Sequence, residues 1–290
     1  MTTPERRHSH RAIEPNTLSS GSASVVSYFM GAIDPLAREF HVVSRRLLPI
    51  KGAEEGNVQK GAPIQEIRFK LVSHVLDVAN TKQVVEYASG SSLQGHSRTQ
   101  KDPGTIYVEC ELPERARHKK DVFAELAATG VITGTSPNLY IEAANALDKS
   151  SIKDVKRRYI NPAKPTVDIA LGLLHYYERA GKEQFLAGVR TTMKAGDMLL
   201  MDTPLLAPEG PTLSQMVSGK IAGIDVNETY FKSLVEADEL YRSFGFVPTR
   251  LNYGLAADIL DLVSPELLGV SLDDIKEQNK YQWLYILTIP

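Results

Sequence analysis

The sequence contains a single cysteine, a single tryptophan and no uninterrupted apolar run of about 18 residues. The one cysteine, Cys110, cannot form a disulfide within the chain, which is typical of a reducing compartment and predicts a cytoplasmic protein. The missing apolar run argues against a membrane-spanning helix. The basic residues near the N-terminus are not followed by the apolar stretch that a signal peptide would need.

Neither sign of charge is in marked excess, with 33 basic and 35 acidic residues and a formal net charge of −2. The chain therefore lacks the global basic field with which proteins attract nucleic acids or anionic membranes. Its seven histidines are scattered without the paired spacing of metal ligands, so no metal site is expected. The composition is that of an ordinary globular protein, and its expected partner is a small-molecule substrate.

Short apolar runs alternate with longer amphipathic segments along the chain. The predicted strands are 83–88, 105–110, 138–143, 166–174, 198–202, 247–253 and 283–289. The predicted helices are 63–80, 113–128, 151–159, 182–193 and 228–244, the last of these capped by Asn227. This alternation implies βαβ units and right-handed crossovers. It predicts a Rossmann-like α/β fold with a seven-stranded, mostly parallel sheet covered by helices on both faces.

The remaining segments suggest how the chain is organised around this sheet. Residues 1–24, rich in Ser, Thr, Pro and Arg, are expected to form a flexible tail. Residues 25–82 form an N-terminal helical segment, in which Pro63 begins the helix 63–80, and residues 83–290 form the α/β domain. Leucines spread among acids over 254–280 predict a helical insertion, which either covers a substrate pocket or forms a homodimer face.

Doubly wound sheets bind ligands beyond the carboxyl ends of their strands, so the strand ends are the places to search. The first strand ends in Ala88-Ser89-Gly90, small residues that allow a ligand to approach the backbone, although ordinary turns have similar compositions. About 20 residues later, Glu109 and Glu111 end the second strand and project to one face. An acid at this point can accept hydrogen bonds from both hydroxyls of a ribose, or it can cap the following helix. We assign the ligand role to Glu111 and a structural role to Glu109.

The stretches VVEYASGSSLQG and IYVECELPERARHKK resemble the leucine carboxyl methyltransferases and the related polyketide O-methyltransferases. The resemblance spans roughly residues 60–205, and its second stretch is the more specific of the two. It implies a class I methyltransferase that uses S-adenosylmethionine. The expected reaction is O-methylation of a carboxylate or a hydroxyl of a small molecule, as in secondary metabolism.

The resemblance also implies a set of cofactor-binding residues. Arg68 matches the arginine that contacts the cofactor's carboxylate, Gly90 lies under the methionine moiety, and Asn145 begins the pair that borders the adenine. The sequence departs from the family at Glu111 and Asn145, where relatives commonly have Asp, and near Leu171, where they tend to have Glu. The full set of expected cofactor contacts is Arg68, Ala88, Ser89, Gly90, Glu111, Asn145, Ala146 and Leu171.

His175 and Tyr176 follow the fourth predicted strand, where class I methyltransferases hold the acceptor near the transferred methyl group. A histidine there can act as general base toward a hydroxyl, whereas a carboxylate acceptor is already ionised at pH 7. We therefore predict that His175 and Tyr176 are catalytic, with packing of His175 beneath the aromatic residues as the alternative.

Two other functions fit parts of the sequence. An NAD(P)-dependent oxidoreductase would also have a parallel sheet, but it would need Gly-x-Gly-x-x-Gly after the first strand, and residues 89–95 lack that spacing. A non-catalytic, methyltransferase-like binding protein is favoured by the departures at Asn145 and Leu171.

Overall fold

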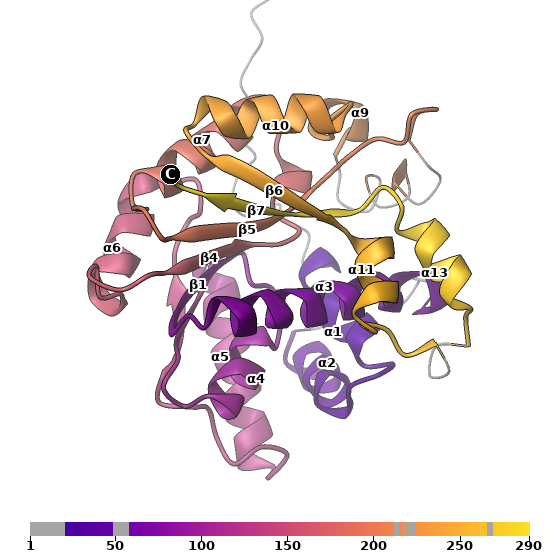
Figure 1. The fold of residues 1–290 in the computed structure, drawn as a ribbon. Coiled ribbons are helices and arrows are strands. Elements are labelled where there is room, and N and C mark those ends of the chain that lie inside the picture. Colours follow the sequence, from indigo (N-terminus) through magenta and orange to yellow (C-terminus); the bar gives the residue numbers. More distant parts are fainter. Residues whose placement is uncertain (1–20, 49–57, 212–214, 217–218, 220–223, 266–268) are drawn as a thin grey trace, which may run out of the picture.

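The computed structural model describes residues 21–48, 58–211, 215–216, 219, 224–265 and 269–290. A seven-stranded sheet runs through its centre in the order β3-β2-β1-β4-β5-β7-β6 (Figure 1). The first five strands are parallel, and β7 lies antiparallel between β5 and β6. The strand order thus reverses between β1 and β4, the position at which doubly wound sheets bind ligands. The strands are β1 (Gln83–Tyr87), β2 (Ile106–Glu111), β3 (Leu139–Ala143), β4 (Val167–Ala170), β5 (Met198–Thr203), β6 (Val247–Asn252) and β7 (Trp283–Thr288).

Helices cover both faces of the sheet, as the alternating sequence pattern predicts. One face carries α3 (Val58–Ala79), α4 (Gln94–Lys101), α5 (Pro113–Ala128) and α11 (Tyr253–Ile259). The other face carries α6 (Lys149–Tyr159), α7 (Arg179–Arg190) and α10 (Leu234–Ser243) (Figure 1). α2 (Pro35–Leu47) packs on α5, α1 (Gly21–Met30) packs on α2 and α3, and α13 (Leu272–Gln278) packs beside α11. In the described residues, no helix is long and apolar enough to span a membrane.

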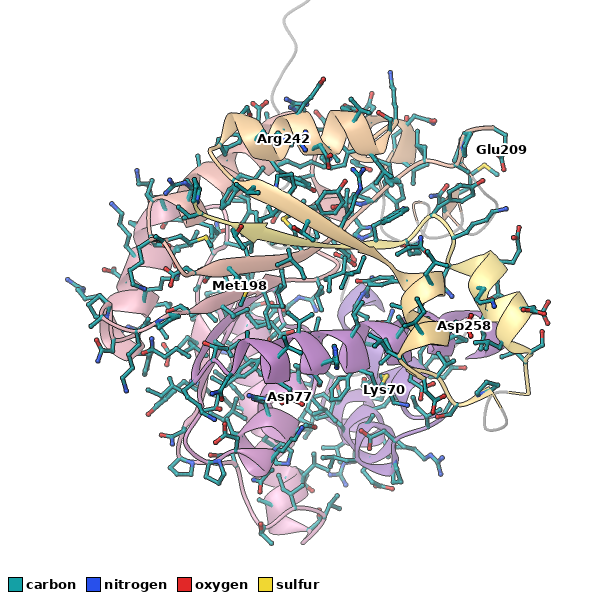
Figure 2. The ribbon with its side chains drawn as sticks, in the orientation of Figure 1. Lys70, Asp77, Met198, Glu209, Arg242 and Asp258 are labelled. Atoms are coloured by element: carbon teal, nitrogen blue, oxygen red, sulfur yellow. The ribbon has the colours of Figure 1, made fainter. Side chains whose placement is uncertain are left out.

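The two central strands, β1 and β4, are buried along their whole length because helices cover both of their faces. Neighbouring residues of β1 point to opposite faces, so that Val84 packs with the α3 side and Val85 with the α7 side. Charged side chains such as Lys70 and Asp77 on α3 and Arg242 on α10 lie on the outer surfaces of their helices (Figure 2). The core thus consists of two apolar layers with the sheet between them.

The predicted strand 166–174 is too long. β4 ends at Ala170, because Gly172 adopts a left-handed φ of +69° and residues Leu174–Tyr176 form the 3-10 turn η2. The left-handed conformation is one that glycine adopts without strain, and it ends the strand. This early end turns His175 back toward the neighbouring strand, β5.

The predicted helix 228–244 with its cap at Asn227 is also wrong. The chain instead forms α9 (Val226–Thr229), capped by Asp225, and then α10, capped by Ser233. Between them, Phe231 pairs with the segment after β5: its N–H donates to the carbonyl of Pro204 at 2.8 Å. This long-range pairing interrupts a segment that local propensity alone would keep helical.

Smaller differences concern the N-terminal half and the insertion. α3 begins at Val58 instead of residue 63, so Pro63 lies inside the helix, and α4 was not predicted. Residues 21–24 of the expected tail belong to α1, while residues 1–20 lie outside the described residues. In the insertion 254–280, α11 packs on α3, yet Leu255 and Ile259 are 61% and 76% exposed.

Gly95 at the start of α4 provides a test of this packing. A Cβ atom at Gly95 would lie 2.6 Å from Oε1 of Glu109 and 2.8 Å from side-chain atoms of Leu139 and Tyr107. We expect Gly95→Ala to lower the free energy of unfolding by about 1–3 kcal/mol in urea denaturation, because the crowded neighbours must shift. Gly104→Ala is the control, since its Cβ would meet only Asp102 at 3.4 Å. Equal stability of the two variants would contradict the close approach of α4 to β2.

Candidate cofactor and acceptor site

The turn after β1 is sharply bent and is held by the end of β2. Ala88 and Gly90 both have φ of +54°, a left-handed conformation that is unusual for alanine. The N–H of Gly90 donates to Oε1 of Glu111 at 2.6 Å, and the N–H of Leu112 donates to Oε2 of Glu111 at 3.1 Å. The structure thus brings together two of the residues expected to bind the cofactor. The contact with Leu112 is not the helix cap of the alternative interpretation, because it involves the N–H of the N-cap residue and not one from the first turn of α5.

Glu109 has surroundings that differ from those of Glu111. Its side chain is fully buried, and its Oε2 lies 2.6 Å from the ammonium of Lys119 on α5. This agrees with the structural role that we assigned to it. The other serines of the turn also have partners: Ser91 Oγ accepts a hydrogen bond from the N–H of Ser27 in α1 at 3.0 Å. The N-terminal helical segment therefore contacts the turn directly.

The residues expected to border the adenine lie on the loop after β3. Asn145 is exposed, and its Oδ1 accepts a hydrogen bond from the N–H of Leu147 at 2.9 Å, which closes its own turn. Ala146 is buried beside it. A groove of about 510 Å³ adjoins this loop, between the start of α6 and α7, and none of its lining residues comes from the glycine turn or from β2. Its lining residues are Asn145, Leu147, Asp148, Lys149, Gln184, Ala187 and Gly188.

A second polar cluster lies at the ends of β4 and β5 and is centred on Asp202. This carboxylate is 1% exposed. Its Oδ1 accepts a hydrogen bond from the N–H of Gly172 at 2.7 Å. Its Oδ2 lies 2.5 Å from Nη2 of Arg68 and 3.4 Å from Nε2 of His175. Arg68, which we expected to bind the cofactor's carboxylate, is therefore already paired with an acid of the protein.

The orientation of the His175 ring follows from its two neighbours. A carboxylate only accepts hydrogen bonds, so Nε2 of His175 carries the hydrogen that faces Asp202. Nδ1 then holds the lone pair and accepts from the hydroxyl of Tyr230, which is 3.3 Å away. Burial outweighs the opposing effect of Asp202 and lowers the pKa of His175 to about 4. At pH 7 the imidazole is therefore neutral, and the same shift makes it a weaker base than an ordinary histidine.

The segment between β4 and α7 lies between the Asp202 cluster and the Glu111 cluster, by which we mean Glu111 with the turn 88–90. Tyr177 lies near Glu111: burial, with a further contribution from this carboxylate, raises the pKa of Tyr177 to about 12. Tyr176 lies near Arg68, whose guanidinium it affects electrostatically. Leu171 is half-buried and packs on the α3 side of the sheet. The predicted residues from 171 to 176 thus lie between the Glu111 cluster and the Asp202 cluster.

Sequence reasoning missed Asp202 and Tyr230. Asp202 ends an apolar run at the carboxyl edge of the sheet, as Glu111 does, so the same search of strand ends could have found it. Tyr230 could not have been found, because the prediction placed it in the first turns of a continuous helix. No group of three or more His, Cys, Asp or Glu side chains in the described ranges is arranged to hold a metal ion.

No family model and no curated protein matches this chain. Solved structures do resemble it. A putative methyltransferase from Thermobifida fusca superposes with a TM-score of 0.60 and 17% identity, over 92% of this chain and 94% of the other. A DUF574 family protein from Streptomyces avermitilis gives a TM-score of 0.59 and 16% identity over 95% and 99%. Mitomycin 7-O-methyltransferase, MmcR, gives 0.52 and 15% over 91% of this chain and 60% of its own.

The fold is that of the class I methyltransferases. The antiparallel β7 between β5 and β6 separates it from the 3-2-1-4-5-6 sheet of dinucleotide-binding domains, and this difference weighs against the oxidoreductase alternative. The expected fold class is therefore confirmed. The narrower resemblance to leucine carboxyl and polyketide methyltransferases stays a prediction. Within this methyltransferase fold, the Glu111 cluster and the Asp202 cluster both lie at the ligand-binding edge of the sheet.

A double-mutant cycle tests the pairing of Arg68 with Asp202. Either Arg68→Met or Asp202→Leu leaves one mostly buried charge without its partner, and we expect each to cost about 3 kcal/mol of unfolding free energy in urea. The double variant should lose much less than the sum of the two, because it buries neither charge. Additive losses would show that the two side chains do not interact.

Proposed function

We propose that this protein is an S-adenosylmethionine-dependent O-methyltransferase that acts on a hydroxyl group of a small molecule. The observation that carries the proposal is the contact between Glu111 and the Gly90 turn at the point where the strand order reverses. In a class I methyltransferase fold, this position joins a turn that accepts the methionine moiety to an acid that accepts the ribose hydroxyls.

The residues at this edge fit such a cofactor. The Glu111 carboxylate offers about four acceptor positions, and only two are used, by the N–H groups of Gly90 and Leu112. Two positions therefore remain for ribose hydroxyls. Arg68 also keeps a donor, because its buried Nε makes no hydrogen bond of normal geometry among the described residues, with the Tyr253 hydroxyl as the neighbour of its guanidinium. A cofactor carboxylate could bind there while Nη2 stays on Asp202.

The choice of a hydroxyl over a carboxylate rests on the Asp202 cluster. Bound S-adenosylmethionine supplies an activated methyl group, so the protein has to align the acceptor oxygen and take up its proton. His175 is neutral, and its Nδ1 could accept the proton once the acceptor's hydroxyl takes the place of the Tyr230 hydroxyl there. Asp202 would stabilise the imidazolium that then forms. Arg68 is assigned to Asp202 and to the cofactor's carboxylate, so it does not serve an anionic acceptor. Tyr176, next to His175, would contact the acceptor.

A second candidate function, binding without methyl transfer, is favoured by one observation. The side-chain oxygen of Asn145 accepts a hydrogen bond within its own turn, so this oxygen already has a partner before any adenine binds. A methyltransferase-like protein that binds the cofactor or a partner without transferring a methyl group would tolerate this. Transfer of a labelled methyl group to any member of a panel of phenols and carboxylic acids would exclude it.

Calorimetric titration with S-adenosylhomocysteine tests the cofactor site. We expect saturable binding by the unmodified protein. Glu111→Ala should weaken this binding by about 1.5–3 kcal/mol, because hydrogen bonds to a charged acceptor are lost. Glu142→Ala is the matched control, since Glu142 lies in the next strand and pairs with Arg158 and Tyr159 instead. Unchanged affinity in folded Glu111→Ala would remove Glu111 from the site.

The acceptor chemistry is tested at His175. His175→Phe should lower the rate of methyl transfer to a phenol by about 10²–10⁴ and leave the affinity for S-adenosylhomocysteine unchanged. Because the pKa of His175 is lowered to about 4, the unmodified enzyme should keep its rate as the pH falls through 6.5, the ordinary value for histidine. Tyr230→Phe removes the hydroxyl that faces Nδ1 and should have a smaller effect. A carboxylic acid methylated equally well by His175→Phe would contradict a hydroxyl acceptor.

A further inference from the structure

Three buried charged side chains meet directly beneath the glycine turn. They are Glu86 of β1, Glu109 of β2 and Lys119 of α5, and each is at most 3% exposed. Lys119 Nζ lies 2.6 Å from Glu109 Oε2, and Glu86 Oε2 accepts a hydrogen bond from the hydroxyl of Tyr107 at 2.8 Å. Two acids share one base, so full ionisation of both acids would leave an excess negative charge in the core. Such a cluster is weak evidence for stability, because removing three charges from water costs several kcal/mol per ion.

Lys119 reaches beyond this ion pair and contacts the turn. Its ammonium donates to the carbonyl of Ser92 at 2.7 Å and lies 3.3 Å from Oγ of Ser89. These two residues are the ends of the turn, and the N–H of Ser92 donates to the carbonyl of Ser89 at 2.9 Å. One ammonium group therefore ties both ends of the turn to the acid in β2.

The four residues of this turn are held by three elements. Gly90 is held by Glu111 at the end of β2, and Ser91 is held by Ser27 in α1. Ser89 and Ser92 are held from below by Lys119. This arrangement gives a physical reason for Ser89 and Ser91, whose hydroxyls take part in it. The turn gains its shape from its partners on three elements.

We propose that Lys119 is a positioning residue for the cofactor: its ammonium fixes the turn Ser89–Ser92 in the shape in which Gly90 meets Glu111. A turn that is already ordered loses less conformational freedom when a ligand binds, so the affinity is higher. The inference rests on the proposed function, because it takes this turn as the binding site of the methionine moiety.

A second buried pair in the protein provides a matched comparison. Lys156 of α6 lies 2.6 Å from Asp168 of β4, the same distance as in the Lys119–Glu109 pair. It too joins a helix lysine to a strand acid, with both residues less than 9% exposed. It packs on the opposite face of the sheet, and the hydrogen bond of its ammonium goes to Asp168 and not to the turn. The two pairs differ in whether the lysine reaches the cofactor site.

The charge balance of the cluster decides which variants are informative. Burial, with the charge of Glu109, raises the pKa of Glu86 to about 7, and burial also raises the pKa of Glu109. The folded protein thus keeps protons that the unfolded chain releases, so stability from the acids is full below pH 4.5 and falls as the pH rises toward 7. Lys119→Met alone would leave both acids without a positive charge to balance them.

The other charged or titratable groups that face the cluster are Tyr107, Glu111 and Arg98.

The experiment therefore uses charge-balanced variants at pH about 6.5, close to the pKa of Glu86. Lys119→Met/Glu109→Gln is compared with Lys156→Met/Asp168→Asn and with the unmodified protein. Circular dichroism and urea unfolding establish that each is folded, and calorimetry measures the affinity for S-adenosylhomocysteine. The first double variant should bind about tenfold more weakly, as expected for the loss of one or two hydrogen bonds that order the turn. The second should bind as the unmodified protein does.

The outcomes separate this inference from the function on which it rests. No binding by the unmodified protein would overturn the proposed function and the inference with it. Equal affinity of the unmodified protein and Lys119→Met/Glu109→Gln would overturn the inference alone, as would equal weakening of both double variants. If the methionine side chain prevents folding, Lys119→Gln/Glu109→Gln removes the same ammonium with little change in volume. It should show the same weakening.

Discussion

The carboxylate of Asp202 is the constraint on which the acceptor half of the site depends. A buried carboxylate must be surrounded by donors, and here the donors come from the bend after β4, from helix α3 and from the turn η2. Satisfying one charge therefore brings Arg68 and His175 to the same point, although they are far apart in the sequence. The N–H of the left-handed Gly172 and the imidazole of His175 both contact this group. The hydrogen bonds that this buried acid requires therefore fix the geometry at the ends of β4 and β5.

Buried ion pairs connect helices to strands throughout the protein. Lys119 with Glu109 and Arg68 with Asp202 lie on the α3 side of the sheet, and Lys156 with Asp168 lies on the α7 side. Pairs of this kind contribute little net stability compared with apolar contacts of the same volume. They do specify how a helix is placed along a strand, because a shift of one residue would leave a charge unpaired. In this protein, two of the three pairs lie at the carboxyl edge, where small displacements matter most.

Most of the fold could be predicted from the sequence because it follows from local patterns. The helix 113–128 matches α5 at both ends, and β1 differs from its prediction by one residue. Glu111 could be chosen because its role depends on its place at a strand end. The prediction failed where a distant contact overrides the local pattern, as at Phe231, whose backbone pairs with the segment after β5. It also could not pair Arg68 with Asp202, because nothing local to either residue indicates a partner 134 positions away.

The antiparallel strand β7 has a consequence for how changes at this edge spread through the sheet. β6 pairs with β7 alone, and β7 lies between β6 and the rest of the sheet. A change that displaces β7 would therefore detach β6 as well. The five parallel strands, which carry the candidate cofactor site, pair with one another without either of them.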